Sequence, residues 1–98
     1  MPILIPLSDP QTLAVSSTAV SLTVPARANA ALITVESNSI RWWDDGSTPT
    51  STTGHLATSG TQVMYFDTGD RDLIVNFKAI RVTSDATLQI SYYVYRRS

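Results

Sequence analysis

Apolar and polar residues alternate with a period of two along much of the chain, which is the pattern of half-buried β-strands. In the segment 19–24, Val20, Leu22 and Val24 fall on one face, and the polar residues between them fall on the other. The clearest alternation covers residues 88–95, and we expect it to form a central strand. Apolar positions do not repeat with helical spacing anywhere over a dozen residues, so the sequence predicts almost no helix.

Short strands separated by turn residues account for most of the chain. The expected strands cover residues 3–7, 12–15, 19–24, 31–37, 40–44, 61–66, 73–82 with a break near Asn76, and 88–95. The turn cluster at 37–39 predicts a hairpin, and the stretch 46–60 is the longest expected loop. This succession of strands favours an all-β fold, an antiparallel β-sandwich of jelly-roll type, with a small β-barrel as the alternative.

The first ten residues are apolar but contain Pro2, Pro6 and Pro10 and no basic residue. A secretory signal needs a positive start and an unbroken apolar stretch, and a membrane span needs ~20 apolar residues, so we expect neither. Proline cannot donate to a strand ladder. We therefore expect residues 1–98 to form one domain, in which 1–10 is an edge strand or an arm that adds to a neighbouring subunit.

Composition narrows the class of protein. The 98 residues have a mass of 10.7 kDa and contain no cysteine. This length allows one small core, which excludes a two-domain enzyme, and no disulfide or thiolate site can form. Seven basic and eight acidic residues give a net charge of −1, without the basic excess that binding many phosphates requires. We therefore expect neither nucleic acid nor a membrane among the partners.

Residues suited to catalysis are few. His55 is the only histidine, and no second His or Cys is present with which it could bind zinc, so we interpret it as a solvated loop residue. No serine lies in a G-x-S-x-G context, and any catalytic triad would depend on that one histidine. The sequence thus predicts no enzyme activity, no cofactor, no catalytic residue and no metal site.

Two acidic clusters are the remaining candidates for binding an ion. They are Asp44–Asp45 and the group Asp67, Asp70 and Asp72. Neither follows the spacing of an EF-hand loop, and Arg71 lies inside the second cluster. Ordinary turn chemistry, in which Asp side chains bind nearby backbone N–H groups, is the favoured interpretation, and calcium binding is the lesser alternative.

Aromatic side chains outside the expected core are more informative. Trp43 alternates with Trp42, while Tyr93 and Tyr95 alternate with the apolar residues of their strand, so these rings should project away from the main core. Such rings are frequent in protein interfaces; they also stack on sugars in carbohydrate-binding sandwiches, or simply cover the ends of a core. The candidates for contact with another subunit are Ile3, Ile5, Trp43, Tyr93 and Tyr95.

The segment 40–54, IRWWDDGSTPTSTTG, carries a further pattern. The pattern consists, in order, of an aliphatic residue, Arg, Trp, a variable residue, Asp-Asp-Gly, a Pro-Thr step and a Gly. In this chain the corresponding fixed residues are Ile40, Arg41, Trp42, Asp44, Asp45, Gly46, Pro49, Thr50 and Gly54. An apolar strand with an Arg, 79–82, and a Tyr-Tyr strand, 91–93, follow. In this order and spacing the chain resembles, over residues 31–95, small structural proteins of tailed bacteriophages and prophages, described as minor virion or head-decoration proteins.

This resemblance implies a virion protein that is made in the host cytoplasm. It would be a capsid decoration or cement protein that binds the outer capsid surface, with the major capsid protein or another virion protein as partner. A homotrimer is expected by analogy with the three-fold positions that decoration proteins occupy. The motif residues would be structural, and Trp43 stands at the variable position. A tail or connector component and a carbohydrate-binding module are the alternatives.

Overall fold

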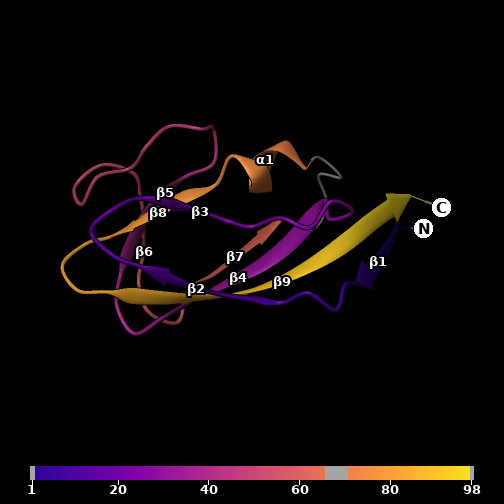
Figure 1. The fold of residues 1–98 in the computed structure, drawn as a ribbon, viewed down its shortest axis with the longest axis horizontal. Coiled ribbons are helices and arrows are strands. Elements are labelled where there is room, and N and C mark those ends of the chain that lie inside the picture. The colour runs from indigo at the N-terminus through magenta and orange to yellow at the C-terminus, as the bar shows by residue number, and fades with distance from the viewer. Residues whose placement is uncertain (1, 66–70, 98) are drawn as a thin grey trace.

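Two antiparallel β-sheets pack face to face in the structure, a computed structural model that describes residues 2–65 and 71–97 (Figure 1). Sheet A contains β1 (Pro2–Pro6), β2 (Gln11–Val15), β4 (Ala30–Glu36), β7 (Gln62–Tyr65) and β9 (Ala86–Arg97). Sheet B contains β3 (Val20–Ser21), β5 (Ile40–Trp43), β6 (His55–Ala57) and β8 (Lys78–Arg81). One helical turn, α1 (Asp72–Val75), precedes β8. The predicted sandwich is confirmed, and the described strands form no closed barrel.

The strand order is that of a jelly roll. In sheet A, β9 has β4 on one edge and both β1 and β2 along the other, and β7 lies outside β4. Sheet B has the order β3-β8-β5-β6. The pairs β2·β9, β3·β8, β4·β7 and β5·β6 nest like the arms of one long hairpin, which is rolled up so that β9 also pairs with β4 and β8 with β5. The long strand β9 thus lies inside sheet A, as its alternation predicts.

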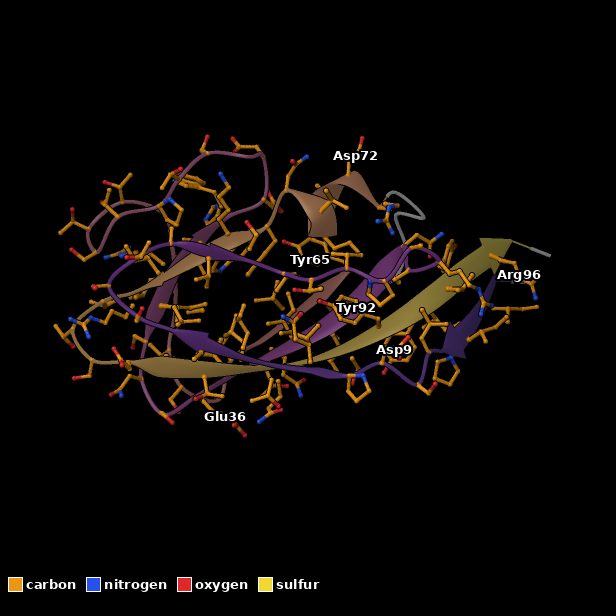
Figure 2. All side chains as sticks on the ribbon, viewed as in Figure 1. Asp9, Glu36, Tyr65, Asp72, Tyr92 and Arg96 are labelled. Carbon is orange, nitrogen blue, oxygen red and sulfur yellow. The ribbon has the colours of Figure 1, made fainter. Side chains whose placement is uncertain are left out.

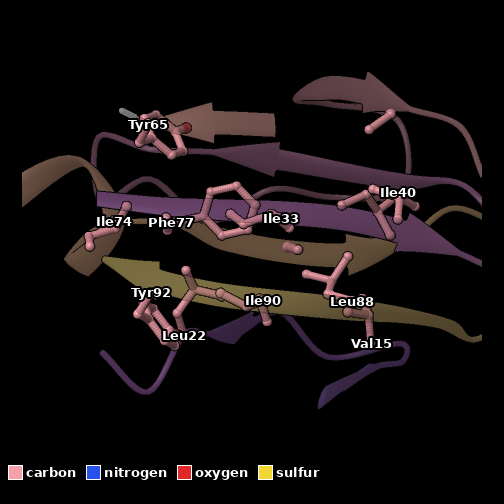
Figure 3. Packing of buried hydrophobic residues seen from close by; sticks show 14 of the residues in the cluster. Val15, Leu22, Ile33, Ile40, Tyr65, Ile74, Phe77, Leu88, Ile90 and Tyr92 are labelled. Carbon is pink, nitrogen blue, oxygen red and sulfur yellow. The ribbon is translucent and has the colours of Figure 1, made fainter. Parts of the chain in front are cut away.

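The core lies between the sheets and takes one face of every strand except β1 (Figure 3). From β9 come Leu88, Ile90 and Tyr92, which are almost completely buried. Ile40 of β5 and Phe77, just before β8, belong to the same cluster. Because every second residue in each sheet points to this side, the period-two pattern of the sequence becomes a two-layer core.

The turn at 37–39 does not join a hairpin, so that prediction is wrong. β4 pairs with β7 and β9 in sheet A, whereas β5 pairs with β6 and β8 in sheet B. The chain crosses between the sheets here, with Ser37 in the left-handed region at φ 76°. Two consecutive strands with one buried face each can pair or can face each other across a core, and their alternation is the same in both cases.

Two further segments differ from expectation. Residues 73–75, expected as strand, belong to α1, a turn that buries Ile74 completely and leaves Val75 43% exposed. The predicted break near Asn76 is where this turn ends. The loop expected over 46–60 contains the short strand β6, which pairs with β5 at the edge of sheet B.

Candidate interaction surface

The outer face of sheet A, which is turned away from the core, carries apolar side chains at one end. Residues opposite each other in an antiparallel pair point to the same side. Leu4 of β1 lies opposite Tyr95 of β9, and Leu32 of β4 lies opposite Met64 of β7, all on the outer side. We call this area the outer apolar patch, and its members are Leu4, Pro6, Leu32, Met64, Tyr93 and Tyr95.

The outer apolar patch is accessible to solvent. Met64 is 58% exposed and Leu4 is 39% exposed. Pro6 is exposed as well, and the other members are half-buried. No member of the patch is charged. Large apolar and aromatic side chains without charges are typical of the centre of a protein interface.

The other half of the same face is polar. Thr12 donates a hydrogen bond to Gln89 Oε1 (2.8 Å), and Gln89 Nε2 donates to Glu36 Oε1 (3.2 Å). Figure 2 shows Glu36 far from the end of the molecule at which Arg96 lies. The polar half therefore satisfies its own side chains, and the apolar half is the part of the face that gains from being covered.

β1 and the last part of β9 extend past the rest of sheet A as a two-stranded ribbon (Figure 1). β4 pairs with β9 only as far as Ala30 opposite Tyr93, whereas β1 pairs with β9 from Tyr93 to Arg97. Beyond β4, the side-chain amide of Asn29 completes the edge of β9. Its oxygen accepts from the backbone N–H of Tyr95 (2.6 Å), and its nitrogen donates to the backbone carbonyl of Tyr95 (3.1 Å).

The structure separates the five residues that the sequence singles out for subunit contact. Tyr93 and Tyr95 lie on the outer face of sheet A, in the outer apolar patch. Ile3 and Ile5 are close by in β1 but point to the opposite side of the ribbon, and Ile3 is 40% exposed. Trp43 belongs to sheet B. The N-terminal segment is an edge strand of the chain's own sheet.

Sequence reasoning misses four members of the patch, Pro6 and three larger apolar residues. Leu4, Leu32 and Met64 alternate with inward-facing neighbours in their strands, which is the signal that places them outside the core. Each one, taken singly, is also an ordinary exposed apolar residue of the kind found on most protein surfaces. Only the pairing of β1, β9, β4 and β7 brings them together.

The two tryptophans are divided as the alternation predicts, because one register cannot bury both in the same core. Trp42 packs against the core and stacks on Phe77 at a centroid distance of 5.3 Å. His55 lies 4.8 Å from the Trp42 ring and 5.0 Å from the Trp43 ring, which it meets edge-on. His55, expected as a solvated loop residue, is exposed and covers part of the half-buried Trp43 ring within the same chain.

The acidic residues of the 40–54 segment bind their own chain. Asp44 Oδ2 accepts a hydrogen bond from the hydroxyl of Tyr65 (2.8 Å), which links the end of β5 in sheet B to β7 in sheet A. Asp45 Oδ1 accepts from the backbone N–H of Ser47 (2.9 Å), and this bond, followed by one to the Ser47 side chain, lowers the pKa of the Asp45 carboxyl. Gly46 follows with φ 87°. Asp45 thus has the turn chemistry that the sequence predicts, whereas Asp44 binds a side chain of the other sheet instead of a nearby backbone N–H.

The remaining motif residues hold the loop between β5 and β6. Arg41 Nη1 donates to the backbone carbonyl of Gly54 (3.1 Å), which has φ 131° and lies against the backbone of Trp42. Pro49 is fully buried. Thr50 and Thr53 exchange two backbone hydrogen bonds (3.0 and 3.2 Å). Each of these residues thus has a structural role in the loop.

No family model matches this chain, and no curated protein or solved structure does either. What it binds must therefore be inferred from its own surface.

Few other features of that surface point to a ligand. In residues 2–65 and 71–97, no three His, Cys, Asp or Glu side chains are placed to hold a metal ion; Asp67 and Asp70 of the second acidic cluster lie outside these ranges. An open hollow of about 400 Å³ lies beside the β5–β6 loop, lined by Pro49, Ile80 and Arg81 among others. No helix of the described chain is long and apolar enough to span a membrane.

Proposed function

We propose that this protein is a structural protein of a bacteriophage virion, a capsid decoration or cement protein that works by binding other protein subunits. The observation that carries the proposal is the outer apolar patch, which is uncharged, contains two tyrosines, and lies on a sheet face whose other half is polar and internally hydrogen-bonded. The phage setting, the capsid as partner and a trimer as the expected oligomer rest on the resemblance of the 40–54 segment.

The shape of the patch suits protein contact better than capture of a small ligand. It covers one face of four neighbouring strands, and a flat sheet face can bury large rings against a partner of similar shape. Tyrosine contributes a large contact area at a small cost in conformational entropy, so Tyr93 and Tyr95 are suited to anchor such a contact.

The fold is compatible with this role. Jelly rolls recur in viral capsid proteins and in lectins, so the strand order supports a virion protein and a carbohydrate-binding module equally. Fold alone does not assign function, and the absence of charge on the patch favours a protein surface as the partner.

Decoration would act through mass action and multivalency. A ligand that binds only the assembled shell stabilises it by an amount that grows with the logarithm of free ligand concentration. An oligomer that engages several capsid subunits at once binds more tightly than any single contact, because the later contacts form at high effective concentration.

The test of this surface uses two lysine substitutions on one strand. Met64→Lys places a charge in the outer apolar patch, and Gln62→Lys places it on the same face of β7 but in the polar half. We expect Met64→Lys to weaken self-association, measured by light scattering after size exclusion, at least tenfold, or about 1.4 kcal/mol. Gln62→Lys should associate like the unmodified protein. Equal association by both variants, or a monomer without substitution, contradicts the proposal.

The capsid role needs a second experiment. The protein is mixed with empty phage heads, assembled from the major capsid protein that the same genome encodes. The amount of protein that sediments together with the heads is measured. Binding that saturates, raises the melting temperature of the heads and is lost with Met64→Lys supports decoration. If the protein binds members of a glycan panel through the patch and does not bind heads, the carbohydrate-binding alternative is favoured.

A further inference from the structure

The ribbon formed by β1 and the end of β9 is held more weakly than the rest of the sandwich. The last residues of β9 have β1 as their one strand neighbour among the described residues, because β4 stops pairing at Tyr93. Two-stranded ribbons are marginally stable on their own. Ile3, Ile5 and Val94 do not belong to the core cluster, and Ile3 and Leu4 remain 40% and 39% exposed. Less apolar burial therefore opposes the release of β1 than the release of a strand that contributes to the core.

The prolines of β1 fall at positions where they do not weaken its pairing with β9. The backbone N–H of Leu7 donates to the carbonyl of Tyr92 (3.0 Å), which marks these two as a hydrogen-bonded pair. By the alternation of antiparallel ladders, the opposed residues Ile5 and Val94 form the next such pair. The backbone groups of the alternate residues then point to the open edge of the sheet. These residues are Pro2, Leu4 and Pro6, and only Leu4 has an N–H there, because proline has none.

This placement disfavours the addition of a further strand outside β1, since two of three donors on that edge are missing. It leaves exchange as the route by which β1 can join two chains. The residues before Pro6 and Pro10 are biased towards extended backbone, so a released arm stays close to the conformation in which it pairs. The exposed residues Ser8, Asp9 and Pro10 supply a hinge that can span ~10 Å.

We propose that β1 exchanges between copies of this protein: the segment 2–6 of one chain leaves its own β9 and pairs with β9 of a second copy in the same register. The exchanged strand makes the same contacts as before, so the exchange costs little beyond the change in the hinge, and it is favoured by high local concentration. The inference rests on the proposed self-association and specifies the element through which the copies are joined.

Cysteine substitution tests this directly, because the chain has no cysteine of its own. Leu4 and Tyr95 are opposed in a pair of the closer, non-hydrogen-bonded kind, with Cα atoms ~4.5 Å apart, which suits a disulfide. Two single variants, Leu4→Cys and Tyr95→Cys, are mixed, concentrated and then oxidised. Because both residues also belong to the outer apolar patch, contact between the patches of two chains can bring them together, and a mixture of Met64→Cys and Tyr95→Cys, which lie in the patch but are not opposed, measures that contribution. Cross-linking of Leu4→Cys with Tyr95→Cys beyond that level forms when β1 of one chain lies on β9 of the other.

The control uses an equivalent pair away from the ribbon. The backbone N–H of Val35 donates to the carbonyl of Thr61 (2.9 Å), so by the alternation of the ladder Thr34 and Gln62, on the outer face of sheet A, are another non-hydrogen-bonded pair. Thr34→Cys and Gln62→Cys are mixed and oxidised in the same way. We expect the ribbon mixture to give at least ten times more cross-linked heterodimer than the control at about 1 mM, and little at about 10 µM, on a non-reducing denaturing gel.

The outcomes separate the two proposals. Oligomers without cross-linked heterodimer overturn strand exchange and leave the proposed association through the outer apolar patch intact. A protein that is monomeric at both concentrations overturns both. A double variant carrying both ribbon cysteines, oxidised at low concentration, should give a disulfide within one chain; if it does not, the pairing of β1 with β9 itself is contradicted.

Discussion

Single residues in the loop between β5 and β6 satisfy backbone requirements that other residue types cannot meet. Gly54 combines φ 131° with close contact to the backbone of Trp42, and Arg41 binds its carbonyl. A Cβ at Gly54 would lie 3.1 Å from the Trp42 nitrogen and 3.2 Å from its carbonyl oxygen. The motif therefore has a glycine here because there is neither the conformation nor the space for a side chain.

Gly54→Ala should consequently destabilise the protein by about 3 kcal/mol, since it adds steric overlap with backbone to an unfavourable φ. Gly60→Ala is the matched control, because Gly60 also has positive φ, 94°, but no atom lies within 4 Å of its Cβ position. That variant should lose only the conformational cost, about 1–2 kcal/mol. Urea unfolding of the three proteins measures the difference, and equal losses would contradict the role of the Trp42 backbone.

Whole strands show where sequence patterns suffice and where they do not. The alternation of residues 88–95 correctly predicts β9 and its central position, because a strand with one buried face leaves that pattern regardless of its partners. The hairpin at 37–39 fails because a turn signal fixes where the chain reverses but not which sheet receives the next strand. The strand expected at 73–75 fails because burial of Ile74 in the core is compatible with a helical turn as well.

The interaction surface, too, could be predicted from the sequence only in part. Alternation within one strand suffices to place Tyr93 and Tyr95 outside the core. Leu32 and Met64 join them only through the pairing of β4 with β9 and β7, and this long-range information is not present in any local pattern. The sequence thus predicts which side of a strand faces outwards, and the strand order determines which outward side chains become neighbours.

The end of β9 depends on Asn29, and this dependence can be measured. Asn29→Ala removes both hydrogen bonds to the Tyr95 backbone, each worth about 1 kcal/mol. We expect the amide of Tyr95 to exchange with solvent roughly tenfold faster by NMR, with little change in the core of β9. Asn38→Ala is the control, since Asn38 also donates to a backbone carbonyl, that of Asp85, but elsewhere in the fold. Unchanged exchange at Tyr95 contradicts the assignment.

At the scale of the whole molecule, two buried tyrosine hydroxyls connect distant parts of the chain. Tyr65 of sheet A donates to Asp44 beside sheet B, and Tyr92 donates to Gln11 Oε1 (2.6 Å). Figure 2 shows both rings in the interior of the molecule. Burial raises the pKa of Tyr92 to about 12, and burial followed by the hydrogen bond to Asp44 raises the pKa of Tyr65 further.

These shifts predict loss of stability at alkaline pH. Above about pH 10 the unfolded chain releases the tyrosine protons while the folded chain retains them, so unfolding becomes more favourable as pH rises. The contribution of each buried tyrosine to stability is fully present below about pH 10. The contribution of Tyr92 is lost progressively as the pH rises from there to about 12. The free energy of unfolding should fall by up to about 1.4 kcal/mol per pH unit for each group. Guanidinium unfolding at several pH values measures this slope, which should flatten in a variant carrying Tyr65→Phe and Tyr92→Phe; an unchanged slope contradicts it.

The two ends of the described chain are neighbours: Pro2 lies opposite Arg97 in the ribbon, while the β5–β6 loop lies at the other end of the molecule (Figure 1). A linker of a few residues could therefore join the termini, and the chain could be reopened at the exposed residues Ser51 and Thr52. In such a circular permutant β1 and β9 become the arms of a continuous hairpin. Peptides fused at the new termini would be presented at the opposite end from the outer apolar patch, which suggests the fold as a scaffold for display.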